Sequence, residues 1–440
     1  MSAELPTARL TDRPHHAPKE ALVPMNDKTS HHLSLVIRNA RLIDGTGAAP
    51  VPSAAVHVAD GRIAWAGPEN DAPRPPAGAT VIDARAGTIL PGFIDCHVHL
   101  AAPGGEMNRA ALAAMPASLR TYLTTPRLLA TLMSGVTTAR DLAGLDAGFK
   151  QAVDRGLVAG PRLQVAVAMM SPTGGHGDFR PPTDSGPVEP SVSRLADGVA
   201  ECRREARNLL RQGADLIKIA ATGGVGSPTD QPDDEGFTEE EIRAVVEVAR
   251  AHRGKRVAAH AQGRGGILNA LRAGVDSIEH GYQLDDEIID LMLAQGTYLV
   301  PTLSTATHTF DPATTPPWTL EKKRQWQGQA LASVPRAIER GVKIAMGTDC
   351  GIAAHGNNLR ELGHLVDHGM APMDAILAGT SVAAGLLDLS GEIGTLEAGK
   401  RADLVVAACD PLADIHRLGD ATNITVVVKD GAVCKNTLDR

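Results

Sequence analysis

Short apolar runs separated by turn residues mark the two ends of the chain. Three such runs lie between residues 33 and 92, and two more follow at 401–411 and 424–436. The runs are rich in valine, isoleucine, leucine and alanine and are bounded by glycine, aspartate or asparagine, which is typical of strands joined by turns. We therefore predict a small composite β-sandwich domain that residues 35–90 and 391–440 form together.

The middle of the chain has a different pattern, in which short apolar segments alternate with helical ones. A capping box of Thr238 and Glu241, for example, marks the start of one helix. Such alternation is typical of βα units and a parallel sheet. The expected strands lie at 93–98, 136–140, 163–168, 215–220, 256–259, 275–279, 298–302 and 342–347. Eight strands predict an α/β fold with a (β/α)8 TIM barrel over residues 91–390.

Composition narrows the classes of protein and partner. The chain has 440 residues, and no run approaches the ~20 apolar residues of a membrane span. The formal net charge of −8 disfavours nucleic acid as a partner, because such binding needs a basic surface. Five cysteines without paired spacing fit a reducing cytoplasm. Residues 1–34 are polar, lack the apolar core of a signal peptide and are expected to form a flexible N-terminal extension.

Two histidines occur where the first expected barrel strand ends. His97 and His99 are two residues apart, so a β-strand places both side chains on one face. At the carboxyl end of a barrel strand, both imidazoles can point toward a shared metal ion in the barrel mouth. Strand histidines are commonly structural, but this position favours metal ligation.

Two further histidines occupy equivalent places on successive strands. His260 ends the fifth expected strand, and His280 ends the sixth, one compact βα unit later. Either residue alone could be a satisfied core histidine. Two histidines in equivalent places indicate metal ligands.

Lys218 stands inside an apolar strand, where an ammonium group loses its hydration. One interpretation is a buried lysine paired with a carboxylate such as that of Asp349. The other is a neutral lysine that captures carbon dioxide and becomes a carbamate, an anionic oxygen ligand able to bridge two cations. Beside a metal-binding set, the carbamate is favoured because it removes the buried positive charge.

Asp349 closes the eighth expected strand. A single aspartate at a strand end is commonly the N-cap of the next helix. In a closed barrel, however, strand eight adjoins strand one, which places this carboxylate next to His97 and His99. The candidate ligands form a nitrogen and oxygen set suited to Zn²⁺ or a similar divalent ion. They are His97, His99, Lys218, His260, His280 and Asp349.

With these motifs the sequence resembles the metal-dependent amidohydrolase superfamily. The matching segments are LPGFIDCHVHL, IKI with Lys218, AHAQG, IEHG, GTDCG and GTLEAGKRADLVV, and the resemblance covers nearly all of residues 35–436. The segments SPTGGHG and GGVGSP look most similar to the imidazolonepropionase-related branch of prolidases, carboxypeptidase-like dipeptidases and ochratoxin-hydrolysing amidases.

The resemblance implies a centre of two divalent ions, expected to be Zn²⁺. Four histidines and one aspartate divide between the ions, and a lysine carboxylated by CO2 bridges them. The implied ligands are His97, His99 and Asp349 for the first ion, His260 and His280 for the second, and Lys218 for both.

The expected reaction is hydrolysis. Two ions lower the pKa of a shared water and polarise the carbonyl that it attacks. Asp349 is expected to accept the proton of the water and pass it to the leaving amine. His176, in the loop after the third strand, is expected to donate a hydrogen bond to the carbonyl or to a substrate carboxylate, unless it is only a solvated loop residue. Tyr282 and Arg180 are weaker candidates for binding the other end of the substrate.

The leading functional hypothesis is hydrolysis of the amide between an acyl group and an amino acid with a free carboxylate. Dipeptides and N-acyl amino acids such as ochratoxin are examples. One alternative is ring opening of a cyclic amide or lactone. A second alternative is a catalytically silent scaffold, which the complete set of candidate ligands disfavours. We also expect a homo-oligomer that acts on a small molecule.

Overall fold

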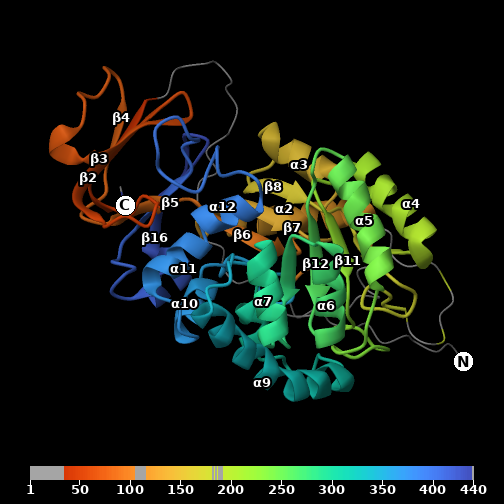
Figure 1. Cartoon of the computed structure of the whole chain (residues 1–440). Coiled ribbons are helices and arrows are strands. Elements are labelled where there is room, and N and C mark those ends of the chain that lie inside the picture. Colours follow the sequence, from red (N-terminus) through yellow and green to blue (C-terminus); the bar gives the residue numbers. More distant parts are fainter. Residues whose placement is uncertain (1–33, 105–114, 181–182, 184–185, 187–191, 439–440) are drawn as a thin grey trace, which may run out of the picture. The chain divides into compact units, whose positions relative to one another are not determined.

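The computed structural model describes residues 34–104, 115–180, 183, 186 and 192–438 (Figure 1). The described residues belong to one compact unit, which spans residues 31–440. Apart from Ser34, the predicted N-terminal extension lies outside the described residues.

Strands from both ends of the chain form one eight-stranded sheet, in the order β17-β16-β15-β5-β1-β2-β3, with β4 paired to β1. The ends meet where Val405 of β15 lies opposite Leu90 of β5 in an antiparallel pair. Ile37 and Val426 belong to the same buried cluster. The strands are β1 (Leu35–Leu42), β2 (Val51–Ala59), β3 (Arg62–Pro68), β4 (Thr80–Asp83), β5 (Thr88–Pro91), β15 (Leu404–Ala407), β16 (Ile424–Lys429) and β17 (Ala432–Asn436). The sandwich form and the domain boundaries stay predictions.

Parallel strands form the middle of the chain in two sheets. One has the order β6-β7-β8, and the other has the order β10-β9-β11-β12-β13-β14. The strands are β6 (Phe93–Val98), β7 (Val136–Asp141), β8 (Arg162–Val165), β9 (Met169–Ser171), β10 (Ser193–Leu195), β11 (Ile217–Ala220), β12 (Val257–Ala261), β13 (Ser277–His280) and β14 (Tyr298–Val300). Seven of the expected barrel strands are thus found as parallel strands.

The eighth expected strand, at 342–347, is an extended segment without a regular ladder. Its backbone nevertheless reaches both neighbours, since Leu299 of β14 donates to the Lys343 carbonyl and Cys96 of β6 donates to the Met346 carbonyl, each at 2.8 Å. At Gly347 the segment approaches β6 so closely that a Cβ atom would lie 2.9 Å from the Cβ of His97. A side chain would not fit at this close approach, and single bridges of Leu299 with Ile344 and of Val98 with Cys350 stand in place of the expected ladder.

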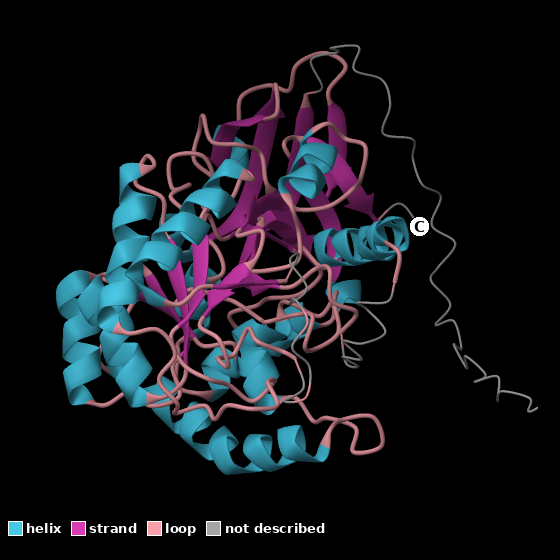
Figure 2. Cartoon of the chain, turned by 90° about the vertical axis from the view of Figure 1, so that its right-hand side faces the viewer, coloured by secondary structure: helices cyan, strands magenta, loops and turns pink. Residues whose placement is uncertain are grey.

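Helices lie beside the parallel strands, as Figure 2 shows. Local sequence explains where several of them begin: the Thr238 and Glu241 side chains form the expected capping box of α5. The helices are α2 (Ala117–Met133), α3 (Ala147–Asp154), α4 (Gly198–Arg211), α5 (Glu239–Ala251), α6 (Arg264–Ala273), α7 (Asp286–Gln295), α8 (Leu303–Thr307), α9 (Pro317–Glu339), α10 (Arg360–Asp367), α11 (Pro372–Ala378) and α12 (Ser381–Leu386), with short 3-10 helices at Glu69–Asp71, Ile415–Gly419 and Ala421–Asn423. Among the described residues, none of the helices has the length and apolar character that crossing a bilayer requires.

Candidate metal centre

The predicted histidine and aspartate ligands lie together at the carboxyl ends of the parallel strands. Asp349 Oδ1 is 3.5 Å from Nε2 of His97 and 3.4 Å from Nε2 of His99. The ring centre of His280 lies 5.1 Å from that of His97 and 4.6 Å from that of His260. His97, His280 and Asp349 each offer a ligand atom, all within 4.8 Å of one another. Side chains from two strands, β6 and β13, and from the segment after residues 342–347 can therefore meet at one cation.

Two of the candidate ligands and one residue that contacts them have a left-handed backbone conformation. His280 has a φ of 74° and Asp349 a φ of 56°, and Thr302, just after β14, has a φ of 51°. Residues other than glycine rarely adopt this left-handed conformation, which persists when the surrounding structure enforces it. Strain at ligand positions is typical of functional sites.

One ring nitrogen of each candidate histidine ligand is held by a protein oxygen. The pairs are His97 Nδ1 with Glu279 Oε2 at 2.8 Å, His99 Nδ1 with the Ala143 carbonyl at 3.1 Å, His260 Nε2 with the Gly223 carbonyl at 3.0 Å, and His280 Nδ1 with Thr302 Oγ1 at 2.7 Å. Carbonyl and carboxylate oxygens only accept, so the nitrogens facing them carry the proton. The opposite nitrogen of a neutral ring then carries the lone pair that a metal ligand needs.

Burial keeps the rings of His97, His260 and His280 neutral. It lowers the pKa of His260 to about 3 and holds the pKa of His97 and His280 well below the ordinary value. Neutral imidazole is the form that binds a metal ion. The histidines are therefore in the ligating state at neutral pH.

Lys218 lies buried in β11 without a contact that would balance the positive charge of its ammonium group. Its Nζ has no hydrogen-bond partner and no ion pair among the described residues. Glu279, one carboxylate whose charge acts on it, is already bound by Arg140 Nη2 at 2.8 Å and by Ser277 Oγ at 2.5 Å. Burial lowers the pKa of the Lys218 ammonium to about 8. The charge of Asp349, the carboxylate of the alternative ion pair, also acts on Lys218, but no ion pair between the two side chains is formed among the described residues.

Asp349 is also buried, and burial raises the pKa of its carboxyl to about 7. The alternative role as a helix cap does not apply, because the next described helix, α10, begins at Arg360 and has Leu359 as its N-cap. Its carboxylate instead faces the two histidines of the first strand. This position suits both a metal ligand and a proton acceptor.

The three predicted substrate contacts differ in their surroundings. The His176 ring stacks on His260, with ring centres 4.0 Å apart and an interplanar angle of 12°. The Tyr282 ring centre lies 6.2 Å from that of His280. Arg180 instead forms a bidentate pair with Asp178, at 2.7 and 2.6 Å. The structure thus brings His176 and Tyr282 to the centre and binds the Arg180 guanidinium within its own loop.

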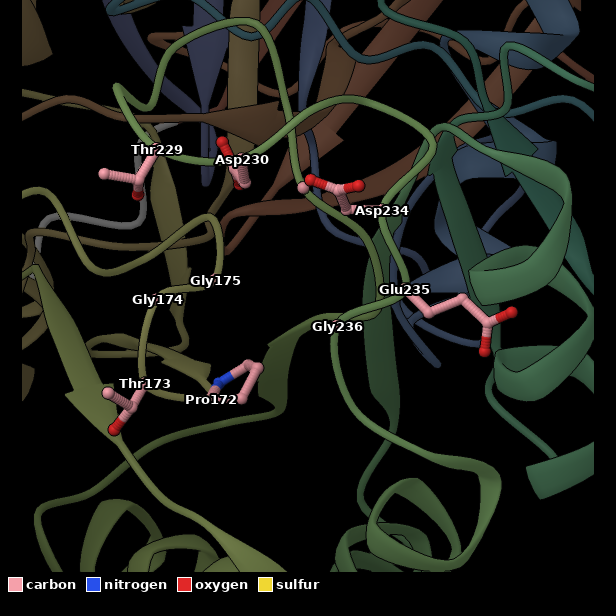
Figure 3. Close-up of a pocket in the computed structure, with 10 residues that line it drawn as sticks. Pro172, Thr173, Gly174, Gly175, Thr229, Asp230, Asp234, Glu235 and Gly236 are labelled. Carbon is pink, nitrogen blue, oxygen red and sulfur yellow. The ribbon is translucent and has the colours of Figure 1, made fainter.

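A cavity of about 410 Å³ lies between the loops that follow β9 and β11 (Figure 3). Gly223, whose carbonyl binds His260, lines this cavity, which therefore adjoins the centre. Figure 3 shows that Gly174, Gly175 and Gly236 border it and that the Glu235 side chain points away. Its volume is within the range of small-molecule sites.

Three supporting residues were not identified from the sequence. Glu279 accepts a hydrogen bond from His97, and Arg140 balances the charge of Glu279. The Thr302 hydroxyl contacts Nδ1 of His280. Arg140 carried a weaker signal than Lys218, because its strand, VTTARD, is itself largely polar although every residue of it is buried. Glu279 also stands directly before His280 in the IEHG segment.

Comparison with known proteins gives the class of the chain. Residues 88–434 match the model of the Amidohydrolase family. Ochratoxinase of Aspergillus niger is 34% identical over 420 residues, covering 91% of this chain and 86% of that protein. Imidazolonepropionase of Rhizorhabdus wittichii is 30% identical, covering 87% of this chain and 95% of that protein. The structure of a prolidase complexed with N-methylphosphonate-L-proline has a TM-score of 0.86 at 33% identity, covering 92% of this chain and all of that one.

The chain therefore belongs to the amidohydrolase family, as the sequence motifs predicted. It is a hydrolase that acts on amide bonds. Members of this family are generally metal-dependent, and the triad of His97, His280 and Asp349 provides a possible metal site here.

Substitution of Thr302 tests whether the hydrogen bond between its hydroxyl and the His280 ring affects metal binding. Thr302→Ala removes the hydroxyl that contacts His280, whereas Thr302→Ser keeps it. Loss of such a contact typically costs 10–100-fold in metal affinity, so we expect zinc to bind more weakly by roughly that factor in the alanine variant alone. Competition with a chelator measures the affinity. Equal zinc affinities of the two variants would show that this contact does not orient His280.

Proposed function

We propose that the chain is a binuclear metal-dependent hydrolase that cleaves the amide bond of N-acyl amino acids or dipeptides with a free carboxylate. The main support is the set of four histidines that are each held at one ring nitrogen by a protein oxygen and gathered beside Asp349. The name ochratoxinase and the N-methylphosphonate-L-proline ligand of the prolidase support an acyl amino acid as substrate. Carboxypeptidase-like hydrolysis of ochratoxin A is included.

The proposed centre holds two divalent ions, most simply Zn²⁺. The first is assigned to His97, His99 and Asp349, the second to His260 and His280, and Lys218 to both. When bound, such ions supply a hydroxide at neutral pH and polarise the scissile carbonyl. The neutral Lys218 amine attacks CO2 and loses one proton, which gives a carbamate with one negative charge.

Other residues of the chain bind the substrate and move the proton. Asp349 accepts a proton from the attacking water and returns it to the leaving nitrogen, so that the amine departs neutral. His176 donates a hydrogen bond to the carbonyl or to the substrate carboxylate. Tyr282 and Arg180 are assigned to the other end of the substrate, and Arg180 must leave Asp178 to reach it.

The proposal also covers the fold that surrounds the metal centre. Strands β6, β7, β8, β11, β12, β13 and β14 and the segment at 342–347 act as one closed (β/α)8 barrel, which the backbone hydrogen bonds of that segment to β14 and β6 support. The sheet built from both chain ends forms the composite small domain. A homo-oligomer in the cytoplasm completes the proposal.

A second candidate function is ring opening of a cyclic amide or lactone, which the similarity to imidazolonepropionase favours. A silent scaffold is disfavoured because every candidate ligand is present. The zinc-loaded protein should be tested on a panel of N-acyl amino acids, dipeptides, cyclic amides and lactones. We expect turnover of the linear amides with a free carboxylate. Turnover of cyclic substrates alone would support the second candidate instead.

Lys218→Ala tests the bridging ligand. We expect activity to be lost, because the variant lacks the oxygen atoms that the carbamate provides. Short carboxylic acids added to the variant should restore part of the activity by supplying such oxygens. Hydrolysis assays with and without the added acid give the comparison. Full activity of Lys218→Ala with both metals bound would contradict the bridging role.

Asp349→Asn tests the proton acceptor. Asparagine keeps the volume and one oxygen but lacks the basic carboxylate. General base catalysis typically contributes 10²–10⁴-fold, so we expect kcat to fall by about that factor, with a smaller change in KM. Zinc content must be measured on the same samples. A kcat near that of the unmodified enzyme, with intact metal content, would assign Asp349 a structural role only.

A further inference from the structure

A series of buried polar contacts connects helix α9 to His176. Lys322 of α9 is 4% exposed, and its Nζ donates to the carbonyls of Ser227 at 2.8 Å, Gly224 at 3.1 Å and Asp230. The Ser227 hydroxyl donates to Asp230 Oδ1. Ser227 Oγ also lies 3.0 Å from His176 Nδ1. The contacts therefore join an insertion after β14 to loops after β9 and β11.

The direction of each hydrogen bond follows from the groups involved. A carboxylate only accepts, so the hydroxyl proton of Ser227 points to Asp230. The Ser227 oxygen is then the acceptor for His176, and Nδ1 of His176 carries a proton. Asp230 Oδ2 lies 3.8 Å from the same nitrogen and stabilises this arrangement electrostatically.

The loop that carries Ser227 and Asp230 is fitted closely to the His176 ring. A Cβ atom on Gly224 would lie 2.4 Å from Nδ1 of His176 and 3.0 Å from Nε2 of His260, so only glycine fits there. Lys322 binds the carbonyls at the start, middle and end of this loop, at Gly224, Ser227 and Asp230. Removing this ammonium leaves three buried carbonyls without their donor.

We propose that Lys322, Asp230 and Ser227 are positioning residues that hold the His176 ring, with its Nδ1 protonated, against His260. The proposal rests on the proposed function, in which His176 contacts the substrate. Asp230 also lines the cavity beside the centre, whereas Ser227 and Lys322 act only through His176. Their substitution should thus have no effect of its own on the reaction once His176 is absent.

A double-mutant analysis tests this directly. Ser227→Ala and Lys322→Met should each lower kcat/KM by roughly 10–100-fold, the loss expected from a small misplacement of a group at the reacting centre. Zinc content should stay unchanged. In a His176→Asn background, neither substitution should lower kcat/KM further, because the interaction that it supports is already gone.

Lys323→Met provides a matched control on the same helix. Lys323 is the neighbouring lysine, and its Nζ donates to the carbonyls of Thr305, at 2.7 Å, and Ala306. Any fold-loss in kcat/KM that Lys323→Met causes should multiply with the fold-loss caused by His176→Asn, as expected for independent sites. The proposal would be overturned if the fold-losses in kcat/KM caused by Ser227→Ala and Lys322→Met also multiplied with the fold-loss caused by His176→Asn. If Lys322→Met does not fold, Ser227→Ala decides, since it removes one hydroxyl only.

A second measurement does not depend on activity. In ¹⁵N spectra of histidine-labelled protein, the His176 signals are those missing from His176→Asn. They should show a protonated Nδ1, and Ser227→Ala should change them. A His176 protonated only at Nε2 would overturn the positioning proposal whatever the substrate is. A protonated Nδ1 together with unchanged kcat/KM in His176→Asn would support the contacts but contradict the proposed role of His176 toward the substrate, and with it the proposal.

Discussion

The contact between Glu279 and His97 is the interaction on which the centre depends. Glu279 is completely buried, accepts the His97 Nδ1 proton at 2.8 Å and is balanced by Arg140 on its other oxygen. A buried carboxylate of this kind is stable only because it is paired and hydrogen-bonded. It orients the His97 lone pair toward Asp349. Because Glu279 is already paired with Arg140, it does not form an ion pair with Lys218, whose Nζ has no hydrogen-bond partner among the described residues.

The chain divides the tasks of the site between strands and loops. Strands carry four of the candidate ligands, since His97, Lys218, His260 and His280 lie on or at the end of β6, β11, β12 and β13. Loops and α9 supply the groups that orient His176, through contacts that cross more than ninety residues of sequence. The candidate metal ligands therefore lie on the sheet, whereas His176, the residue proposed to contact the substrate, lies on a loop, and loops differ more between relatives than strands do.

The residue pattern predicted much of this arrangement. Seven parallel strands, the joining of both chain ends in one sheet and the grouping of His97, His99, His280 and Asp349 could be foreseen from periodicity and strand order. The irregular eighth segment could not, because single backbone contacts to β14 and β6, which leave no pattern in the sequence, hold it in place. Contacts such as Glu279 with His97, or Lys322 with Ser227, also leave no local pattern, since they join residues that are distant in sequence.

The zinc content of the protein tests the central claim most directly. The chain should be loaded with zinc in buffer with bicarbonate and in buffer free of CO2, and the metal should be counted by elemental analysis. With bicarbonate we expect about two zinc ions per chain, because the Lys218 carbamate bridges them, and a lower content without CO2. A content near zero in both buffers, or two ions per chain regardless of CO2, would contradict the carbamate-bridged centre.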